Sequence, residues 1–297
     1  MGKLDGKVAA ITGGGRGIGR GIAKLFAKNG CALVVNDLGV TVAGQKETQS
    51  PADDVAKEIK AEGGTAVSNH MDIATVEGGE GLVNQAIREF GKLDILVNVA
   101  GILRDRMIFN MSEQEWDDVI RVHLKGHFCT MRPATAHMRE RKAGRIINFS
   151  SNSGLGSPGQ PNYGAAKAGI LGLTYSTALA MQKYNVTCNA ILPGAATRMT
   201  DTVPEGRMRM ATNRVTSENA EGTSRDPANV APIVLFLASD EAQNVTGQAF
   251  GASGYRIMRY RHIVPDKIIY TSGPWDIDQL FETLKGTLLQ DLEPPRM

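Results

Sequence analysis

Cysteine is scarce in this chain: its 297 residues include only Cys31, Cys129 and Cys188, which lie far apart in the sequence. An odd number of scattered thiols does not make a disulfide framework and fits reduced thiols in a cytosol. The cysteines also offer no cluster of metal ligands. We therefore expect a cytoplasmic protein that binds no metal.

The chain also lacks an excess of charge of one sign and any long apolar run. Its net charge is +2, and charged and hydrophobic residues make up 22% and 42% of the sequence. These proportions are typical of a soluble globular protein rather than of a nucleic-acid binder or a disordered chain. Residues 1–7 are too polar for a signal peptide, and no apolar run approaches the length that crosses a bilayer. We expect neither a nucleic-acid partner nor a membrane.

What the chain does contain is an alternation of short apolar runs with longer helical patterns, from Lys7 to about Gly251. This alternation predicts an α/β fold in which one doubly wound parallel sheet, in a single domain, carries helices on both faces. The carboxyl ends of the strands then line one edge of the sheet, where such folds bind ligands. The expected strands are Val8–Ile11, Ala32–Val35, Thr65–His70, Leu93–Val97, Arg145–Phe149 and Val186–Ile191.

Three segments depart from this pattern. Residues 38–51 form an unusually long connection after the second strand, which suggests a functional or mobile loop. The polar stretch 197–226 is either a lid over the substrate or an ordinary loop, and the sequence leaves both open. Residues 255–297 form a carboxyl-terminal extension to a catalytic domain at 1–254, with an expected strand near 255–264 and an amphipathic helix near 277–289.

A glycine-rich turn joins the first strand to the first helix. It places Gly13, Gly17 and Gly19 around Ile18, where missing side chains let the backbone approach a pyrophosphate. The amino terminus of the following helix favours negative charge. The spacing predicts a dinucleotide site, although glycines alone are a weak signal.

Asp37 ends the second predicted strand, where a carboxylate accepts the hydroxyls of an adenosine ribose and repels a 2′-phosphate. An aspartate at this place also occurs as a simple loop or capping residue. Arg16 favours NADP instead, because a guanidinium in the glycine turn is able to contact a 2′-phosphate. We give Asp37 the greater weight and expect NAD as the cofactor.

Tyr163 and Lys167 stand one helical turn apart, so both side chains lie on one helix face. A phenol titrates near pH 10 and is a poor acid or base at neutrality unless a cation stabilises the phenolate. A lone pair of this kind is more often an ordinary surface Tyr and Lys. The glycine turn upstream shifts the interpretation towards hydride-transfer chemistry.

Six motifs follow one another in order, each at a predicted strand end or helix start. They are Thr12-Gly13-x-x-x-Gly17-x-Gly19, Asp72, Asn98-Val99-Ala100-Gly101, the serines after the fifth strand, Tyr163-x-x-x-Lys167 and Pro193-Gly194. With this set, residues 5–254 resemble the short-chain dehydrogenase/reductase family. The resemblance implies a Rossmann-like fold, a small-molecule substrate, a nicotinamide cofactor and assembly into a homodimer or homotetramer.

The resemblance also implies roles for individual residues. Tyr163 is then the acid/base, Lys167 lowers its pKa and holds the nicotinamide ribose, and a serine hydrogen-bonds the substrate oxygen. The residues expected at the cofactor are Gly13, Arg16, Gly17, Ile18, Gly19, Asp37, Asp72, Ile73, Asn98, Ala100, Gly101, Tyr163, Lys167, Pro193, Gly194 and Ala196.

Which serine acts depends on the direction of counting. Counting from the fifth strand selects Ser151, whereas counting back from Tyr163 selects Ser150. We favour Ser151, because strand register sets side-chain direction and a surface loop readily loses a residue. Ser153 is a weaker candidate, and each of the three also suits a turn.

Two positions depart from the family pattern. His123 stands where many relatives have an asparagine that supports a water relay to the lysine, and it either replaces that function or is a packed structural histidine. Arg198 takes the place of the usual threonine, so Thr197 or Thr200 is left to contact the carboxamide. The sequence does not decide between the two threonines.

A closer likeness lies in Val35-Asn36-Asp37-Leu38-Gly39, residues 101–106, Val122-His123-Leu124 and Arg198-Met199-Thr200. These stretches resemble the (3R)-hydroxyacyl-CoA dehydrogenase portion of peroxisomal multifunctional enzymes. The expected reaction is oxidation of a 3-hydroxyacyl-CoA or hydroxysteroid-like alcohol by a stand-alone enzyme. The alternatives are an NADP-dependent ketoreductase and a catalytically silent nucleotide sensor.

Overall fold

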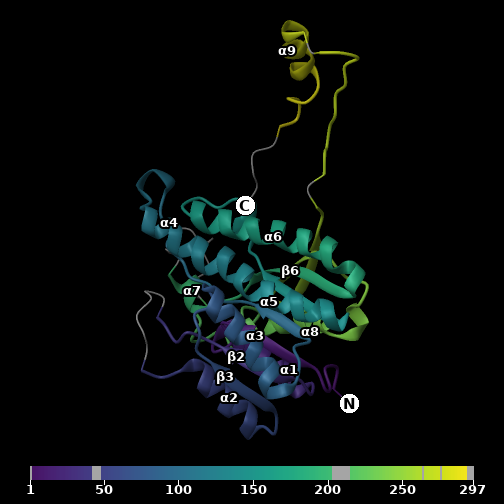
Figure 1. The fold of residues 1–297 in the computed structure, drawn as a ribbon. Helices are drawn as coiled ribbons and strands as arrows, with labels where there is room; N and C mark the ends of the chain where they lie inside the picture. The colour runs from purple at the N-terminus through teal and green to yellow at the C-terminus, as the bar shows by residue number, and fades with distance from the viewer. Residues whose placement is uncertain (1, 42–47, 203–214, 263, 275, 293–297) are drawn as a thin grey trace.

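A computed structural model describes residues 2–41, 48–202, 215–262, 264–274 and 276–292. Its centre is an eight-stranded sheet of order β3-β2-β1-β4-β5-β6-β7-β8 (Figure 1). Neighbouring strands are parallel except β8, which runs antiparallel to β7. The strands are β1 Val8–Thr12, β2 Ala32–Asn36, β3 Thr65–Asn69, β4 Ile95–Asn98, β5 Gly144–Phe149, β6 Val186–Gly194, β7 Ala249–Ser253 and β8 Arg256–Tyr260.

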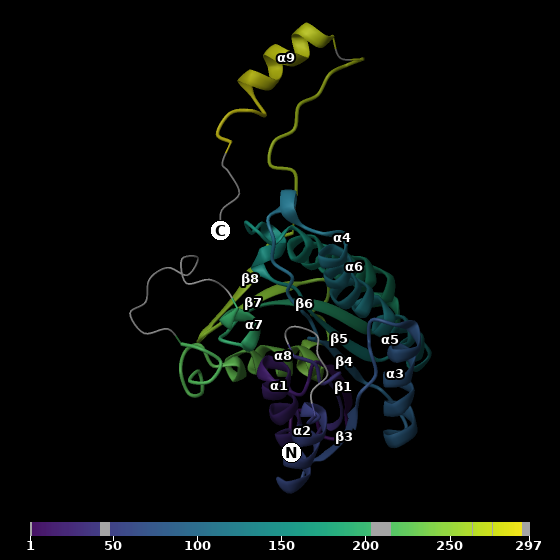
Figure 2. The same cartoon turned by 90° about the vertical axis from the view of Figure 1, so that its left-hand side faces the viewer.

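Helices cover both faces of the sheet, which confirms the predicted doubly wound fold (Figure 2). The helices are α1 Gly17–Lys28, α2 Pro51–Ala61, α3 Val76–Phe90, α4 Glu113–Ile120, α5 Gly126–Arg141, α6 Pro161–Met181, α7 Arg198–Asp201, α8 Ala231–Ala238 and α9 Ile277–Gly286. A π-helical turn, η2 (Arg121–Lys125), joins α4 to α5, and a 3-10 turn, η3 (Asn152–Leu155), follows β5.

Alternation along the strands divides the core into two layers. On β1, Ala9 and Ile11 pack in the layer under α1, α2 and α8, whereas Val8 and Ala10 pack in the layer under α3, α5 and α6. Successive side chains of a strand point to opposite faces, so a strand covered on both sides reads as a continuous apolar run. The fold could therefore be predicted from the short apolar runs in the sequence.

Polar side chains set where several helices begin. Ser50, Thr75 and Ser112 accept backbone N–H bonds at the starts of α2, α3 and α4, and Ser112 with Glu115 completes a capping box. At its other end, α3 stops at Gly91, which adopts a left-handed conformation. These caps place the strand–helix junctions at the edge where the site forms.

The observed boundaries differ from the predicted ones by a few residues. The fourth strand begins at Ile95 instead of Leu93, because the Asp94 carboxylate accepts the Val8 N–H in front of it. The sixth strand runs on to Gly194, paired with β7 as far as Ser253. The long connection 38–51 and the polar stretch 197–226 include residues 42–47 and 203–214, which lie outside the described residues, so the alternatives for both segments stay open.

The chain beyond Gly254 first adds β8 to the sheet and then leaves the body of the molecule. Strand β8 is shorter than the predicted strand, and α9 ends at Gly286 rather than near residue 289. Both views show α9 well away from the sheet and its covering helices (Figures 1 and 2). Among the described residues, no helix is both long and apolar enough to cross a membrane.

Candidate active site

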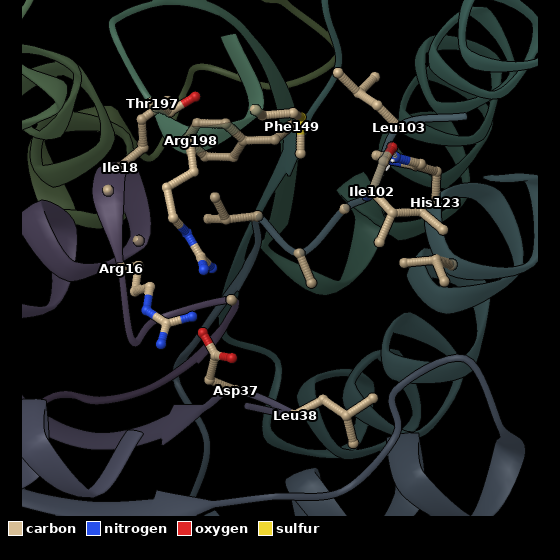
Figure 3. A pocket seen from close by; sticks show the side chains of 18 of the residues that line it. Arg16, Ile18, Asp37, Leu38, Ile102, Leu103, His123, Phe149, Thr197 and Arg198 are labelled. Atoms are coloured by element: carbon tan, nitrogen blue, oxygen red, sulfur yellow. Dashed lines mark hydrogen bonds between the residues drawn. The ribbon is translucent and has the colours of Figure 1, made fainter. Parts of the chain in front are cut away.

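A cavity of about 680 Å³ opens at the carboxyl edge of the strands (Figure 3). Segments that follow β1, β2, β3, β4, β5 and β6 contribute to its wall, as the topology of a doubly wound sheet predicts. The predicted site residues found in this wall are Gly13, Arg16, Gly17, Ile18, Gly19, Asp37, Asp72, Ile73, Ala100, Gly101, His123, Tyr163, Lys167, Pro193 and Ala196.

The glycine turn has the geometry of a phosphate cradle. Gly13 and Gly17 have φ angles of 61° and 48°, which side-chain-bearing residues rarely adopt. A Cβ on Gly13 would lie 2.9 Å from the Cα of Ala100, and one on Gly17 would point across the cavity at Thr197. Helix α1 begins at Gly17, and the side chain of its N-cap residue makes no capping hydrogen bond. Backbone N–H groups at this helix terminus therefore suit an anionic pyrophosphate.

Asp37 stands at the opposite end of this cradle. Its two carboxylate oxygens accept the backbone N–H groups of Gly15, at 3.2 Å, and Gly39, at 3.0 Å. In Figure 3 the Arg16 guanidinium and the Asp37 carboxylate point toward one another, while Arg198 extends into the space above them. A fixed carboxylate with lone pairs left over fits a ribose diol.

Helix α6 presents Tyr163 and Lys167 to the cavity one turn apart. The Lys167 ammonium lies 5.4 Å from the centre of the Tyr163 ring and donates to the backbone O of Phe149 at 2.6 Å. Burial lowers the pKa of Lys167 to about 7 and raises the pKa of Tyr163 to about 12. Ser151 acts against this burial effect and lowers the Tyr163 pKa. That Lys167 also lowers the Tyr163 pKa stays a prediction.

The three candidate serines occupy different surroundings. Ser150 is buried, and its hydroxyl donates to the backbone O of Lys167 at 2.8 Å. Ser151 caps η3, where its Oγ accepts the Ser153 N–H at 3.2 Å, and its hydroxyl lowers the pKa of Tyr163. Ser153 donates to Gln160 at 2.9 Å. Ser150 is part of the cavity wall, whereas Ser151, the predicted catalytic serine, is not. The Ser150 hydroxyl is already engaged, and Ser151 is the serine that acts on the Tyr163 pKa.

His123 lies in the π-helical turn η2, a distortion that is frequent at functional sites. Its Nε2 atom lies 2.7 Å from the backbone O and 3.0 Å from the backbone N of Ile102, and its ring meets the Tyr163 ring edge-on at 5.1 Å. Burial, with the nearby charge of Lys167, holds the His123 pKa well below its ordinary value. A neutral imidazole thus braces the segment after β4 against the phenol.

Two of the predicted cofactor residues are not part of the cavity wall. The Asn98 amide is buried behind it, donating to Asn148 at 3.0 Å and accepting from Thr130 at 2.8 Å. Gly194 packs against Ser253 of β7. Both stand at strand ends as expected, but their contacts join sheet strands and helix α5, which the strand-end position alone does not reveal.

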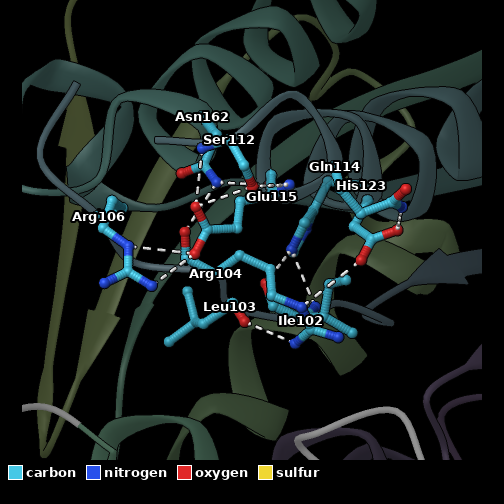
Figure 4. A network of polar contacts seen from close by, with 10 residues as sticks. Ile102, Leu103, Arg104, Arg106, Ser112, Gln114, Glu115, His123 and Asn162 are labelled. Atoms are coloured by element: carbon cyan, nitrogen blue, oxygen red, sulfur yellow. Dashed lines mark hydrogen bonds and ion pairs between the residues drawn. The ribbon is translucent and has the colours of Figure 1, made fainter. Parts of the chain in front are cut away.

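Sequence reasoning also missed residues that organise the wall. Asn162, fully buried, donates to the backbone O of both Arg104 and Glu115, and its own Oδ1 accepts the Tyr163 N–H at 2.7 Å (Figure 4). Its place directly before Tyr163 at the start of α6 was the available signal. Arg106 pairs with Glu115 at 2.9 Å in the same network, which ties the loop after β4 to α4.

The choice between the two threonines is clearer in three dimensions. Thr197 forms part of the cavity wall close to Gly17, whereas the Thr200 hydroxyl donates to the backbone O of Thr197 at 2.8 Å. Thr197 is therefore the threonine that faces the cavity. Among the described residues, no group of three or more His, Cys, Asp and Glu side chains converges as a metal site.

A phosphate cradle and a Tyr–Lys–Ser group at one edge of a doubly wound sheet define a nicotinamide-nucleotide oxidoreductase. The family model described as short chain dehydrogenase matches residues 7–208, and the chain belongs to that family. A solved structure, a short chain dehydrogenase from Mycobacterium avium, is 42% identical and has a TM-score of 0.84, covering 99% of this chain and 98% of its own.

Curated relatives come from two kinds of protein. The peroxisomal multifunctional enzyme type 2 of Mus musculus is 42% identical over 247 residues, which are 82% of this chain and 31% of the mouse protein. This chain therefore spans about a third of the length of that relative. The 3-oxoacyl-[acyl-carrier-protein] reductase FabG of Staphylococcus aureus is 40% identical over 84% of this chain and 97% of its own length.

Proposed function

We propose that this protein oxidises a secondary alcohol with NAD, or reduces the corresponding ketone with NADH, and that its substrate is a 3-hydroxyacyl thioester. The observation that carries the proposal is the Tyr163 phenol with the buried Lys167 ammonium 5.4 Å from its ring centre and with Ser151 near enough to lower the phenol pKa. Such a group holds one oxygen atom and exchanges one proton with it. A protein that only senses a nucleotide has no need of all three side chains.

In the proposed mechanism, Ser151 holds the substrate oxygen while Tyr163 exchanges a proton with it. The nicotinamide, when bound, supplies the hydride chemistry. In the direction of reduction, the neutral phenol donates its proton to the oxygen, and its raised pKa keeps it protonated at neutral pH. In the direction of oxidation, the phenolate takes the hydroxyl proton. His123 and Asn162 position the phenol by holding the neighbouring segments.

Two observations support a thioester substrate. Ile102, Leu103 and Met199 give the wall beside Tyr163 an apolar surface suited to an acyl chain. The name of the Staphylococcus aureus relative describes a 3-oxoacyl substrate, the ketone partner of a 3-hydroxyacyl group. Asp37 supports NAD over NADP, and Arg16 is the residue that favours the NADP-dependent ketoreductase alternative.

The remaining parts of the proposal concern the whole chain. We assign residues 1–254 to the catalytic domain and 255–297 to an extension, and we place the protein in the cytoplasm. We further propose a homo-oligomer, a dimer or tetramer, because the extension carries apolar side chains that its own body leaves uncovered. Ile268, Tyr270 and Phe281 are 59%, 84% and 61% exposed.

The test is an assay of nicotinamide reduction, with NAD and NADP in parallel, across 3-hydroxyacyl-CoA thioesters, hydroxysteroids and simple secondary alcohols. We expect turnover with NAD and a thioester. The Tyr163→Phe variant should lose a factor on the order of 10² to 10⁴ in kcat while it still folds and binds NADH. Full turnover by that variant would refute the assignment, and turnover of free alcohols alone would refute the thioester.

A further inference from the structure

Strand β8, which the family model does not include, contacts the loop that holds the catalytic serine. The Tyr260 hydroxyl donates to the Asn152 Oδ1 at 2.7 Å, across 108 positions of the chain. Asn152 directly follows Ser151 and begins the turn η3 that Ser151 caps. Tyr260, on the edge strand β8, thus contacts the loop that carries Ser151.

The Tyr260 side chain is itself held in place from two directions. Tyr260 lies opposite Ala249 in the β7–β8 ladder. Its ring packs with Leu171 of α6 against a small apolar cluster of Ala190, Leu192 and Ala249. A ring seated by strand pairing and packing carries its hydroxyl at a defined position, with little conformational freedom left to lose.

A second contact from the same segment reaches α6 directly. Two residues beyond Tyr260, His262 stacks on Tyr175 with ring centres 4.4 Å apart and planes at 24°. Tyr163, Lys167, Leu171 and Tyr175 follow one another at intervals of four along α6, and each step turns about 40° around the helix axis, so Tyr175 lies about 120° around the helix from Tyr163. The extension therefore contacts α6 at Tyr175, about two turns beyond Lys167.

We infer that Tyr260 is a positioning residue for catalysis, acting through Asn152 to hold Ser151 against Tyr163. This inference rests on the proposed function, because it uses the role of Ser151 at the substrate oxygen. Since Ser151 lowers the Tyr163 pKa, a serine loop that holds Ser151 less firmly leaves that pKa higher. Loss of the Tyr260 hydroxyl should thus alter chemistry and its pH dependence, and leave cofactor binding intact.

The experiment removes the hydroxyl alone. In Tyr260→Phe the ring packing is retained, and we expect kcat for oxidation to fall about three- to tenfold, the effect of one lost neutral hydrogen bond. The pH at half-maximal kcat should move upward, while KM for NAD stays unchanged. Tyr255→Phe is the matched control, because Tyr255 belongs to the same extension and is 80% exposed. An unchanged kcat and pH profile in Tyr260→Phe overturns the inference.

A double-mutant cycle separates this contact from a general effect on folding. Asn152→Ala should reproduce the kinetic effect of Tyr260→Phe, and the double variant should add nothing further. The melting temperatures of the same three variants are measured as well. The two single-variant decreases in melting temperature should not add up in the double variant, and this comparison needs no substrate. Additive changes there overturn the inference, whereas a wild-type protein that is silent across the substrate panel counts against the proposed function.

Discussion

Burial acts on Tyr163 and Lys167 in opposite directions: it raises the pKa of the phenol to about 12 and lowers the pKa of the ammonium to about 7. In both cases the buried environment disfavours the charged form. Sequence spacing predicted that the two residues share a helix face. It did not predict the size of either effect, since desolvation depends on segments distant in the sequence that bury the two side chains.

The lysine carries a testable stability effect. Lys167 is protonated in the unfolded chain up to pH 10.5 but loses its proton near pH 7 in the folded one, so unfolding binds a proton between these values and stability rises with pH there. Lys167→Met removes this dependence. Its stability relative to wild type should improve as pH falls from about 9.5 to 7, by on the order of a few kcal/mol, in denaturant unfolding.

Lys57→Met is the control for this series, because Lys57 is an exposed lysine on α2. Its stability relative to wild type should be flat over the same pH range. A flat difference for Lys167→Met as well would show that Lys167 is not desolvated in the folded protein. The lost Lys167–Phe149 hydrogen bond adds a penalty that does not vary with pH, so the slope is the informative quantity.

Asp37 is the residue whose removal tests the cofactor choice. Asp37→Ala should reduce the preference for NAD over NADP by about tenfold or more, since it removes charged acceptors for a ribose diol and the repulsion of a 2′-phosphate. The measurement is the ratio of kcat/KM for the two cofactors. Asp54→Ala, an exposed carboxylate on α2, should leave the ratio unchanged. If the NAD/NADP ratio of kcat/KM were the same in Asp37→Ala as in Asp54→Ala, Asp37 would have only a structural role, as the acceptor of the Gly15 and Gly39 N–H groups.

At the scale of the elements, a glycine allows helices α3 and α5 to pack closely against each other. A Cβ on Gly79 of α3 would overlap the Cys129 carbonyl of α5, so the two helix backbones approach directly. The sequence marks Gly79 only as an unfavourable residue inside a helical pattern. A glycine is needed at this position because α5, which contacts it at Cys129, lies 50 positions further along the chain.

This contact predicts opposite effects for two helical glycines. Gly79→Ala should lower the free energy of unfolding by roughly 1–3 kcal/mol, because α3 and α5 must separate. Gly172→Ala in α6 should raise it by up to about 1 kcal/mol, since an added Cβ there meets no atom within 4 Å and the helix gains propensity. Chemical denaturation of the two variants tests this, and similar changes in both would contradict the close helix contact.

At the scale of the whole molecule, the extension carries apolar side chains that the rest of the same chain does not bury. Residues 264–274 and 276–292 lie away from the body, and α9 has no buried residue although Ile277 and Phe281 are apolar and exposed. The sequence predicted a strand followed by an amphipathic helix but gave no direction in space. A segment with so few contacts to its own body suits coverage by another copy of the chain.

Deletion of the residues after His262 tests that role. The shortened protein keeps β8, Tyr260 and His262, so the serine loop and its turnover should be largely retained. We expect a smaller assembly than that of the full chain by light scattering at equal concentration. The double variant Ile277→Ser with Phe281→Ser should shift the mass in the same direction. An unchanged mass in both would assign assembly to other surfaces.

Local chemistry was readable from the sequence because it depends on neighbours within a few residues. Glycines between a strand and a helix, an aspartate at a strand end and Tyr–Lys at one helical turn each occupy one stretch of chain, and their order indicated the fold. The tertiary structure was required for Thr197 over Thr200, the buried amide of Asn98 and the Tyr260–Asn152 contact. Each depends on which distant segment supplies a hydrogen-bond partner, and only packing brings such partners together.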